Sequence, residues 1–385
     1  MPLTFKCLAK SFFGGLLALN VSTTSSMAEE ITIGVAAPLS GAFGALGLQV
    51  KTGAEFAAET LNKLAAESGN PTRFLVEAVD DKCAADEAES VANQLVGKGV
   101  IAVIGHICDR ASIEASKIYA DNQIIQISPA SQNPNFTDNR PNQSGGTYRL
   151  AARNSQQADA ISEYLIGLTD ANIAIINDGS VYGKGLADLL EAELVEASKA
   201  PVLVEDYETG EESYRRLAGR IVDSGATVVF IGGFHLDAAV LIRDLDKLST
   251  KMKIVGGDGL VHPEFPKLVL DDNLEREDLS NINVAFPPDP RRFPWARALV
   301  KTMTEKEKSA NGLTLKGYAA VQILSDMLLT SDPNSYDGFS QTLNNKTFNT
   351  VLGPISFNEI GDSNLIDYLI HSWDGEKLKP LAPGQ

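Results

Sequence analysis

Short apolar runs alternate along the chain with longer segments whose apolar residues recur at helical spacing. In the first third, β-branched and aliphatic runs occupy residues 31–35, 74–79, 100–104 and 124–127. The segments between them predict helices over residues 50–64, 84–96 and 110–119. Strands separated by helical segments of this length indicate βαβ units and a parallel sheet.

The same rhythm restarts in the middle of the chain. Strand-like runs lie at residues 173–176, 202–204, 228–231 and 254–256, and helical patterns follow the first three at 185–197, 214–222 and 238–245. Between the two halves, residues 133–146 are rich in Asn, Pro, Gly and Ser, which is typical of a loop. We therefore expect an α/β protein with two doubly wound parallel-sheet lobes.

The last third of the chain does not repeat this rhythm a third time. It contains a proline-rich segment at 286–290, helical patterns at 294–306 and 318–329, and strand-like runs at 354–357 and 368–373. We interpret these as pieces that return to complete both lobes, which gives several chain crossings and a hinge. The expected first lobe comprises residues 29–149 plus 285–350, and the second comprises 150–284 plus 351–385.

The first 28 residues have the pattern of a cleaved secretory signal. Lys6 and Lys10 precede an apolar segment at residues 12–19, and Ser26 and Ala28 supply a small-x-small end. The apolar segment is shorter than the roughly 20 residues that a membrane-spanning helix needs. We therefore expect an exported, periplasmic protein from which residues 1–28 are removed.

Cleavage would remove Cys7 and leave two cysteines, Cys83 and Cys108, each just after a predicted strand. The carboxyl ends of neighbouring parallel strands meet at one edge of a sheet, so both sulfur atoms are expected at that edge. An even number of cysteines in an exported chain indicates a disulfide, with two unrelated reduced thiols as the alternative. Because the chain has no Cys-x-x-Cys motif, we expect a structural bond.

Charge and motifs narrow the function classes. The formal net charge is −17, and loss of the two signal lysines brings the mature chain near −19. Phosphate backbones repel such a chain, so we expect no nucleic-acid partner. The four histidines show no metal-ligand spacing, and the sequence has no Gly-x-Ser-x-Gly elbow or phosphate loop. The sequence predicts a binding protein without metal or cofactor rather than an enzyme.

Ordered motifs over essentially the whole mature chain resemble the periplasmic leucine/isoleucine/valine-binding proteins of ABC importers. The similar stretches are IGVAAPLSG at 33–41, DD at 80–81, VIGHIC at 103–108, ISPA at 127–130, YGKGL at 182–186, GGFH at 232–235 and VLGPISF at 351–357. The resemblance implies the type I periplasmic binding fold, in which two lobes close like a Venus flytrap. It also implies a disulfide between the cysteines that match Cys83 and Cys108.

The resemblance places the ligand carboxylate beside two small hydroxyl residues. Here these positions are Asp109 and Gln132, with Ala130 and Ser131 adjacent to the latter. An ionised Asp109 would repel a carboxylate unless Arg110 compensated through a charge-assisted bond. Alternatively, Asp109 caps the helix that follows by accepting backbone N–H bonds, and one side chain can do both. Backbone N–H groups at the helix starts after these strands suit an anion, if the ligand carries one.

The resemblance also places the ligand ammonium. The acidic residue that binds it corresponds to Asp258, for which ordinary Asp-Gly turn chemistry is the alternative. The tyrosine at a helix start corresponds to Tyr182, with packing as the alternative. A second tyrosine is replaced by Phe234, and the aromatic residue of the first loop by Leu46. Two acidic residues near the cleft favour a ligand with a cationic or amide-like group.

The function implied by the resemblance is that of a monomeric periplasmic solute-binding protein. It would close around a small amino-acid-like ligand, either a branched-chain amino acid or a related amine or amide, because a ligand that contacts both lobes favours the closed form. The closed protein would deliver the ligand to an ABC permease at the inner membrane. A ligand sensor on the same fold, signalling to a receptor or regulator, is the alternative.

Overall fold

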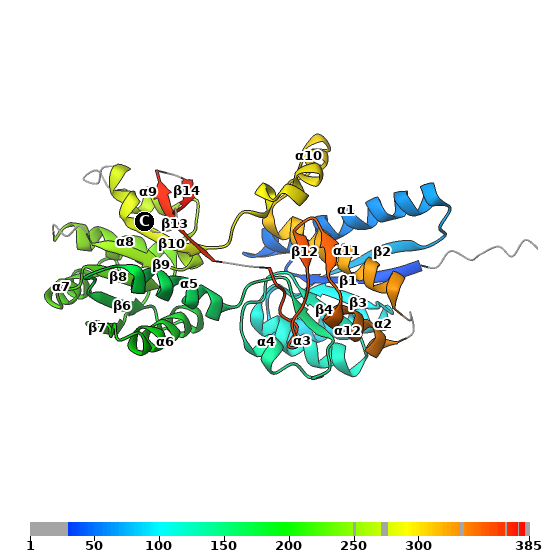
Figure 1. Ribbon diagram of the computed structural model, residues 1–385, viewed down its shortest axis with the longest axis horizontal. Coiled ribbons are helices and arrows are strands. Elements are labelled where there is room, and N and C mark those ends of the chain that lie inside the picture. The colour runs from blue at the N-terminus through cyan, green and yellow to red at the C-terminus, as the bar shows by residue number, and fades with distance from the viewer. Residues whose placement is uncertain are drawn as a thin grey trace, which may run out of the picture.

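The chain folds into two α/β lobes that lie side by side along the longest axis of the molecule (Figure 1). The computed structural model describes residues 30–248, 252–270, 276–331, 335–365, 368–375 and 377–381. The predicted secretory signal at residues 1–28 lies outside these ranges. The prediction of two lobes with parallel sheets is confirmed.

The first lobe is built on a five-stranded parallel sheet in the order β2-β1-β3-β4-β5. Its strands are β1 (Glu30–Ala37), β2 (Arg73–Asp80), β3 (Ala102–Gly105), β4 (Ile125–Ser128) and β5 (Thr147–Arg149). Its helices are α1 (Gly44–Ser68), α2 (Ala85–Gly97), α3 (Asp109–Asp121), α4 (Asn135–Asp138), α10 (Arg297–Glu305), α11 (Gly312–Thr330) and α12 (Tyr336–Asn345).

The second lobe is built on a seven-stranded sheet in the order β14-β13-β10-β9-β8-β6-β7. Its parallel strands are β6 (Ile173–Asn177), β7 (Leu203–Asp206), β8 (Val228–Gly232), β9 (Lys253–Gly256) and β10 (Ile282–Phe286), and the antiparallel ones are β13 (Leu369–Asp374) and β14 (Lys377–Pro380). Its helices are α5 (Asn154–Gly167), α6 (Val181–Glu196), α7 (Arg215–Asp223), α8 (His235–Asp246), α9 (Phe265–Val269), η1 (Asp258–Leu260) and η2 (Arg276–Asn281).

Helices cover both faces of each sheet, which explains why the strands are almost continuously apolar. In β1, Ile33 and Val35 pack into a core beneath α1 and α11, whereas Ala36 packs into a separate core with α2 and α3. The second lobe likewise has one core on each face of its sheet. Ligands of such folds bind outside the carboxyl ends of the strands, and those ends carry the predicted site residues.

The chain crosses between the lobes near residues 150–153, near 287–289, and between Leu365 and Tyr368 (Figure 1). The last crossing comes later than predicted. Strands β11 (Phe348–Thr350) and β12 (Gly353–Ile355) form a hairpin whose residues pack in the core of the first lobe. The short apolar run there predicts a strand but does not reveal which lobe buries it. Residues 285 and 286 belong instead to β10 of the second lobe.

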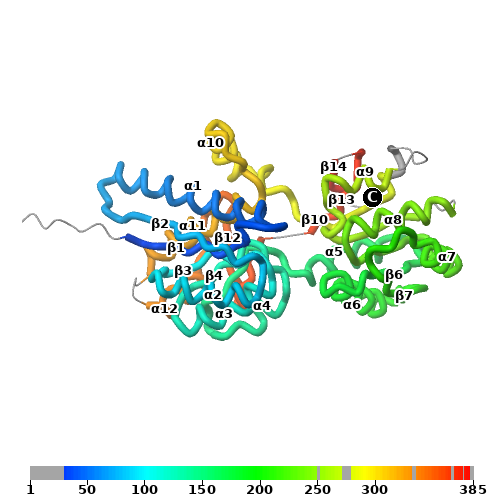
Figure 2. Tube along the Cα trace, turned by 180° about the vertical axis from the view of Figure 1, so that it is seen from behind, coloured from blue at the N-terminus to red at the C-terminus, as the bar shows by residue number. Residues whose placement is uncertain are grey.

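Helix α11 begins at Gly312, six residues before the predicted start at residue 318. It runs along α1, as Figure 2 shows from behind. Two glycines allow this close approach: a Cβ atom on Gly53 would lie 1.9 Å from the carbonyl oxygen of Thr314, and one on Gly317 would lie 2.5 Å from that of Val50. Both glycines are therefore packing residues, and they fix the first turns of α11 against α1.

The predicted disulfide is confirmed. Cys83 and Cys108 are bonded, with their Cα atoms 5.5 Å apart, at the carboxyl edge of the first sheet. Cys108 is the residue immediately before α3. Within the described ranges, none of the helices combines the length and apolar character needed to span a bilayer.

Candidate functional site

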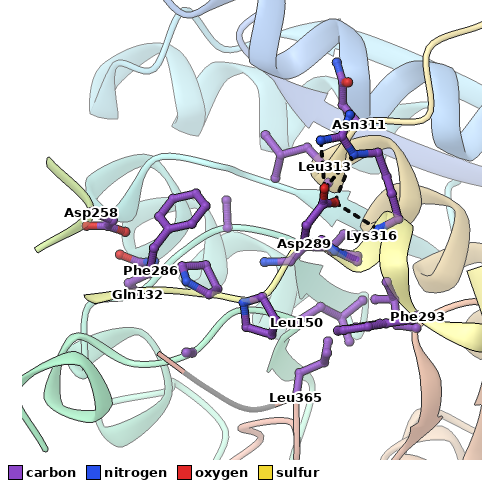
Figure 3. Close-up of a pocket in the computed structure, with 18 of the residues that line it drawn as sticks. Gln132, Leu150, Asp258, Phe286, Asp289, Phe293, Asn311, Leu313, Lys316 and Leu365 are labelled. Atoms are coloured by element: carbon purple, nitrogen blue, oxygen red, sulfur yellow. Dashed lines mark hydrogen bonds and ion pairs between the residues drawn. The ribbon is translucent and has the colours of Figure 1, made fainter. Parts of the chain in front are cut away.

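A cavity of about 540 Å³ lies between the lobes, next to the second crossing (Figure 3). Its lining is mostly apolar and includes Leu46, Leu150, Phe286, Phe293, Leu313 and Leu365. The polar side chains that line it are Gln132, Asp258, Asp289, Arg291, Asn311 and Lys316. The cavity therefore combines apolar walls with a few charged groups, as small-molecule sites do.

Asp258 marks the wall contributed by the second lobe. It is the first residue of η1, two residues after the end of β9, and two tyrosines donate hydrogen bonds to its carboxylate. The Tyr182 hydroxyl lies 2.8 Å from one oxygen, and the Tyr368 hydroxyl lies 3.4 Å from the other. A Cβ atom on Gly257 would lie 2.2 Å from the Tyr182 hydroxyl, so glycine is required at that position for this contact.

The tyrosines remain hydrogen-bond donors at neutral pH. Burial, followed by the negative charge of Asp258, holds the pKa values of Tyr182 and Tyr368 well above their ordinary range. Tyr368 also accepts a 2.6 Å hydrogen bond from the side-chain amide of Gln132 in the first lobe. A continuous chain of hydrogen bonds therefore joins the two walls at the hinge side of the cavity.

Asp109 occupies the equivalent edge of the first lobe but does not line the cavity. It is the first residue of α3, and one of its carboxylate oxygens accepts hydrogen bonds from the backbone N–H groups of Gln132 and Asn133, at 2.8 and 3.1 Å. The carboxylate thus binds the loop after β4 rather than the start of its own helix. The exposed Arg110 forms no ion pair with any residue that the structure describes, so it does not compensate Asp109.

The loop after β4 is also held from beneath. Ser131 is fully buried, and its hydroxyl pairs with that of Ser112. The fully buried Arg149 donates to the carbonyl oxygens of Ser131 and Asn133 at 3.1 and 2.9 Å. Arg149 in turn lies 2.7 Å from the carboxylate of Asp362. Only Ala130 and Gln132 of this loop reach the cavity wall among the described lining residues.

Of the remaining predicted site residues, one lines the cavity and two lie outside its lining. Leu46, near the start of α1, lines the cavity. Phe234 precedes α8 and is half exposed, and its ring centroid lies 5.5 Å from that of Tyr182. It supports Tyr182 and is not part of the cavity wall described above. Tyr182 reaches the site through its hydrogen bond to Asp258.

The sequence reading missed Lys316 and Tyr368. Lys316 lies on the second turn of α11, ahead of the predicted helix start, and lines the cavity. Burial lowers the pKa of Lys316 to about 8, and the charge of Asp258 partly opposes that shift. Tyr368 lies in a predicted strand, but the local sequence pattern does not show that its hydroxyl contacts residues of both lobes.

A second polar cluster lies in the second lobe, outside the cavity lining. His235, His262 and Glu264 bring possible metal-ligand atoms within 4.8 Å of one another, although the histidines are far apart in sequence. The two imidazole rings stack with centroids 4.0 Å apart and an interplanar angle of 14°. Ring nitrogens coordinate metals in the plane of the ring, so parallel stacked rings do not converge on one ion as they stand.

Comparisons with known proteins agree with this architecture. A family model described as periplasmic binding protein matches residues 30–367. The Leu/Ile/Val-binding protein homolog 1 of Brucella abortus (strain 2308) is 31% identical over 368 residues, which cover 95% of this chain and 96% of that protein. An amino acid binding protein of Pseudomonas aeruginosa is 32% identical over 371 residues, which cover 95% of this chain and 97% of that protein.

Solved structures show the same fold at lower identity. An ABC transporter substrate-binding protein from Desulfitobacterium hafniense, in complex with Leu, has a TM-score of 0.73 and 21% identity, with 92% of this chain and 100% of that chain covered. Together with the two-lobed sheets, the cavity between them and the family match over nearly the whole described chain, these similarities show that the chain belongs to the periplasmic binding protein family.

Proposed function

We propose that this protein binds a small amino-acid-like ligand between its lobes and delivers it to an ABC importer. The observation that carries the proposal is Asp258, a carboxylate on the wall of a mostly apolar cavity. Each tyrosine hydroxyl uses one acceptor site of Asp258, and an ionised carboxylate has about four. Asp258 therefore has capacity left to accept hydrogen bonds from a ligand ammonium.

The apolar lining supports an aliphatic ligand body. Leucine, phenylalanine and proline side chains surround the space between the charged groups, and about 540 Å³ falls within the range of small-molecule sites. A branched-chain amino acid, or a related amine or amide, fits this combination. The names of the Brucella and Pseudomonas relatives, which refer to Leu/Ile/Val and to amino acids, support the same class.

Closure provides the mechanism for delivery. Ala130, Gln132 and Leu46 of the first lobe share the cavity with Asp258 of the second. A ligand that contacts both walls binds the closed form more tightly and shifts the population toward it. The permease would then recognise the closed form. We further propose that residues 1–28 direct export to the periplasm and that the mature protein is a monomer there.

The test combines calorimetry with small-angle scattering. L-Leucine, L-isoleucine, L-valine and L-leucinamide are titrated into the wild-type protein, Asp258→Asn and the control Asp188→Asn, whose carboxylate pairs with Lys184 on the exposed face of α6. We expect at least one compound to bind and reduce the radius of gyration, with binding weakened in Asp258→Asn alone. At 100 times its Kd the ligand should stabilise the protein by about 2.7 kcal/mol. Binding to none of the four, or equal binding to all three proteins, contradicts the proposal.

A further inference from the structure

The backbone N–H groups after β4 are not free to bind an anion. Such groups at the end of a strand, facing a cleft, are a natural anion site. Here the N–H groups of Gln132 and Asn133 both donate to Asp109. The N–H group of Ser131 donates to the hydroxyl of Ser128 at 2.9 Å. The protein's own side chains therefore already use these N–H donors of the loop after β4.

Among the lining residues that the structure describes, Arg291 and Lys316 are cationic, and Arg291 is paired. The guanidinium of Arg291 donates to both carboxylate oxygens of Asp289 at 2.8 to 3.0 Å. The ammonium of Lys316 forms no hydrogen bond or ion pair with any residue that the structure describes. Lys316 is thus the cationic group of the cavity wall that is available to a ligand.

The backbone position of Lys316 is fixed. It lies between the buried Leu315 and Gly317, and Gly317 approaches the backbone of α1 too closely to admit a Cβ atom. Lys316 of the first lobe and Asp258 of the second both line the cavity, where Figure 3 labels them together with Phe286 and Asp289. One lobe therefore presents a positive charge and the other a negative charge, across an apolar space.

An unpaired ammonium in this position has an energetic consequence. Withdrawing a charge from water is unfavourable unless an opposite charge and hydrogen bonds replace the lost hydration. Closure of the lobes would withdraw Lys316 further from water. An occupant that brings an anionic group removes this penalty, whereas an occupant without one increases it.

We propose that Lys316 is the anion subsite of this cavity, which binds a carboxylate of the ligand while Asp258 binds its ammonium. This inference rests on the proposed function, because it concerns the same cavity. It names the ligand class as an amino acid with an aliphatic body whose carboxylate is recognised by a lysine of α11 rather than by the loop after β4. It also makes Lys316 a residue that selects carboxylates over carboxamides.

Matched ligand pairs test the assignment. L-Leucine and L-leucinamide differ only in the group on the α-carbon, which is a carboxylate in the first and a carboxamide in the second. In 6-aminohexanoate and 6-aminohexanamide the same two groups lie at the end of an aliphatic chain, far from the ammonium. The first pair tests an α-carboxylate and the second a distal one. Each pair is titrated by calorimetry into the wild-type protein, Lys316→Met, Lys316→Arg and the control Lys301→Met, whose lysine is exposed on α10.

We expect the carboxylate member of at least one pair to bind roughly 10- to 100-fold more tightly than its amide, as a charge-assisted bond predicts. That advantage should disappear in Lys316→Met and persist in Lys316→Arg and Lys301→Met. A thermal unfolding curve checks that each variant is folded. The inference is overturned if the carboxylate keeps its advantage in Lys316→Met, or if wild type binds both members equally.

Two further outcomes distinguish failure of the anion subsite from failure of the proposed function. If Lys316→Met weakens both members of a pair equally, Lys316 acts through Asp258 or through closure, and the anion subsite is rejected while the proposed function stands. If none of the four compounds binds to wild type, the proposed function fails for this ligand class and the subsite fails with it.

Discussion

Two carboxylates, Asp109 and Asp258, follow strands at facing edges of the two lobes, and they have opposite surroundings. Asp109 is directed into its own lobe and accepts two backbone N–H bonds from the loop after β4. Asp258 lines the cavity and accepts from two tyrosine hydroxyls, one of which extends from the third crossing. The first carboxylate binds a loop of its own lobe, and we propose that the second, on the cavity wall, binds the ligand.

The difference shows that proximity to a cleft does not make an acidic residue part of its chemistry. The hydrogen-bond partners of the carboxylate decide whether it can bind a ligand. A carboxylate whose oxygens already accept hydrogen bonds from fixed backbone amides has little capacity left for a ligand. A carboxylate on a cavity wall with unused acceptor sites can accept hydrogen bonds from a ligand. The same reasoning distinguishes Arg291, which is paired with Asp289, from Lys316, which has no such partner in the described part of the chain.

The largest effect on the free energy of unfolding is expected at the ion-pair cluster that holds the loop after β4, to which Asp109 binds. Asp362 lies 2.7 Å from both Arg149 and Arg153, and the Arg149 side chain is fully buried. Asp362→Asn should lower the free energy of unfolding by about 3 to 5 kcal/mol, because it leaves buried charge without a counter-ion. Urea unfolding measures this. The control Asp138→Asn removes a more exposed partner of Arg153 and should cost below about 1 kcal/mol. A loss no larger than that of the control would refute the structural role of the cluster.

A smaller effect is expected at Asp109 itself. Asp109→Ala leaves the N–H groups of Gln132 and Asn133 without their acceptor, which should lower the free energy of unfolding by roughly 1 to 3 kcal/mol. Asp109→Asn retains an acceptor oxygen and should lose less. Thermal or urea unfolding compares the two variants. Equal stability of Asp109→Ala and wild type would show that these bonds do not hold the loop.

The smallest effect concerns the pH dependence contributed by Lys316. Burial lowers its pKa to about 8, below the ordinary value of 10.5, so the unfolded chain binds more protons between these values. Stability should therefore rise with pH in wild type relative to Lys316→Met, by roughly 1.4 kcal/mol between pH 7 and 9. Burial keeps the phenols of Tyr182 and Tyr368 protonated in this range, and Asp258, Asp289 and Arg291 line the same cavity in both proteins.

Urea unfolding of both proteins at pH 7, 8 and 9 measures this difference. Contributions from groups elsewhere cancel, because the two proteins share them. A constant difference across the three pH values would contradict a buried, charged lysine at the cavity.

The alternation of apolar runs and helical patterns was sufficient to predict two parallel-sheet lobes, because each βαβ unit is encoded locally. It could not place the hairpin of β11 and β12, since burial of a short run such as Ile355 depends on which lobe its neighbours reach. The start of α11 was missed for a related reason. The helix begins at Gly312, ahead of the predicted start at residue 318, and Gly317 allows its close contact with α1.

The site was predicted in part. The resemblance identified Asp258 and Tyr182, which the structure joins by a 2.8 Å hydrogen bond. It also identified Asp109, but a motif position cannot show that the carboxylate turns toward Gln132 and Asn133. Lys316 and Tyr368 come from segments far away in sequence, and only the folded chain brings them to the cavity.

The comparison between the two carboxylates is tested most directly by one calorimetric experiment. L-Leucine and L-leucinamide, which both carry an ammonium, are titrated into wild type, Asp258→Asn and Asp109→Asn. The account predicts that Asp258→Asn weakens binding about 100-fold, in line with the loss of a charged hydrogen-bond partner, whereas Asp109→Asn stays within about threefold of wild type. An equal or larger loss in Asp109→Asn would contradict the assignment of Asp258, rather than Asp109, as the carboxylate that meets the ligand.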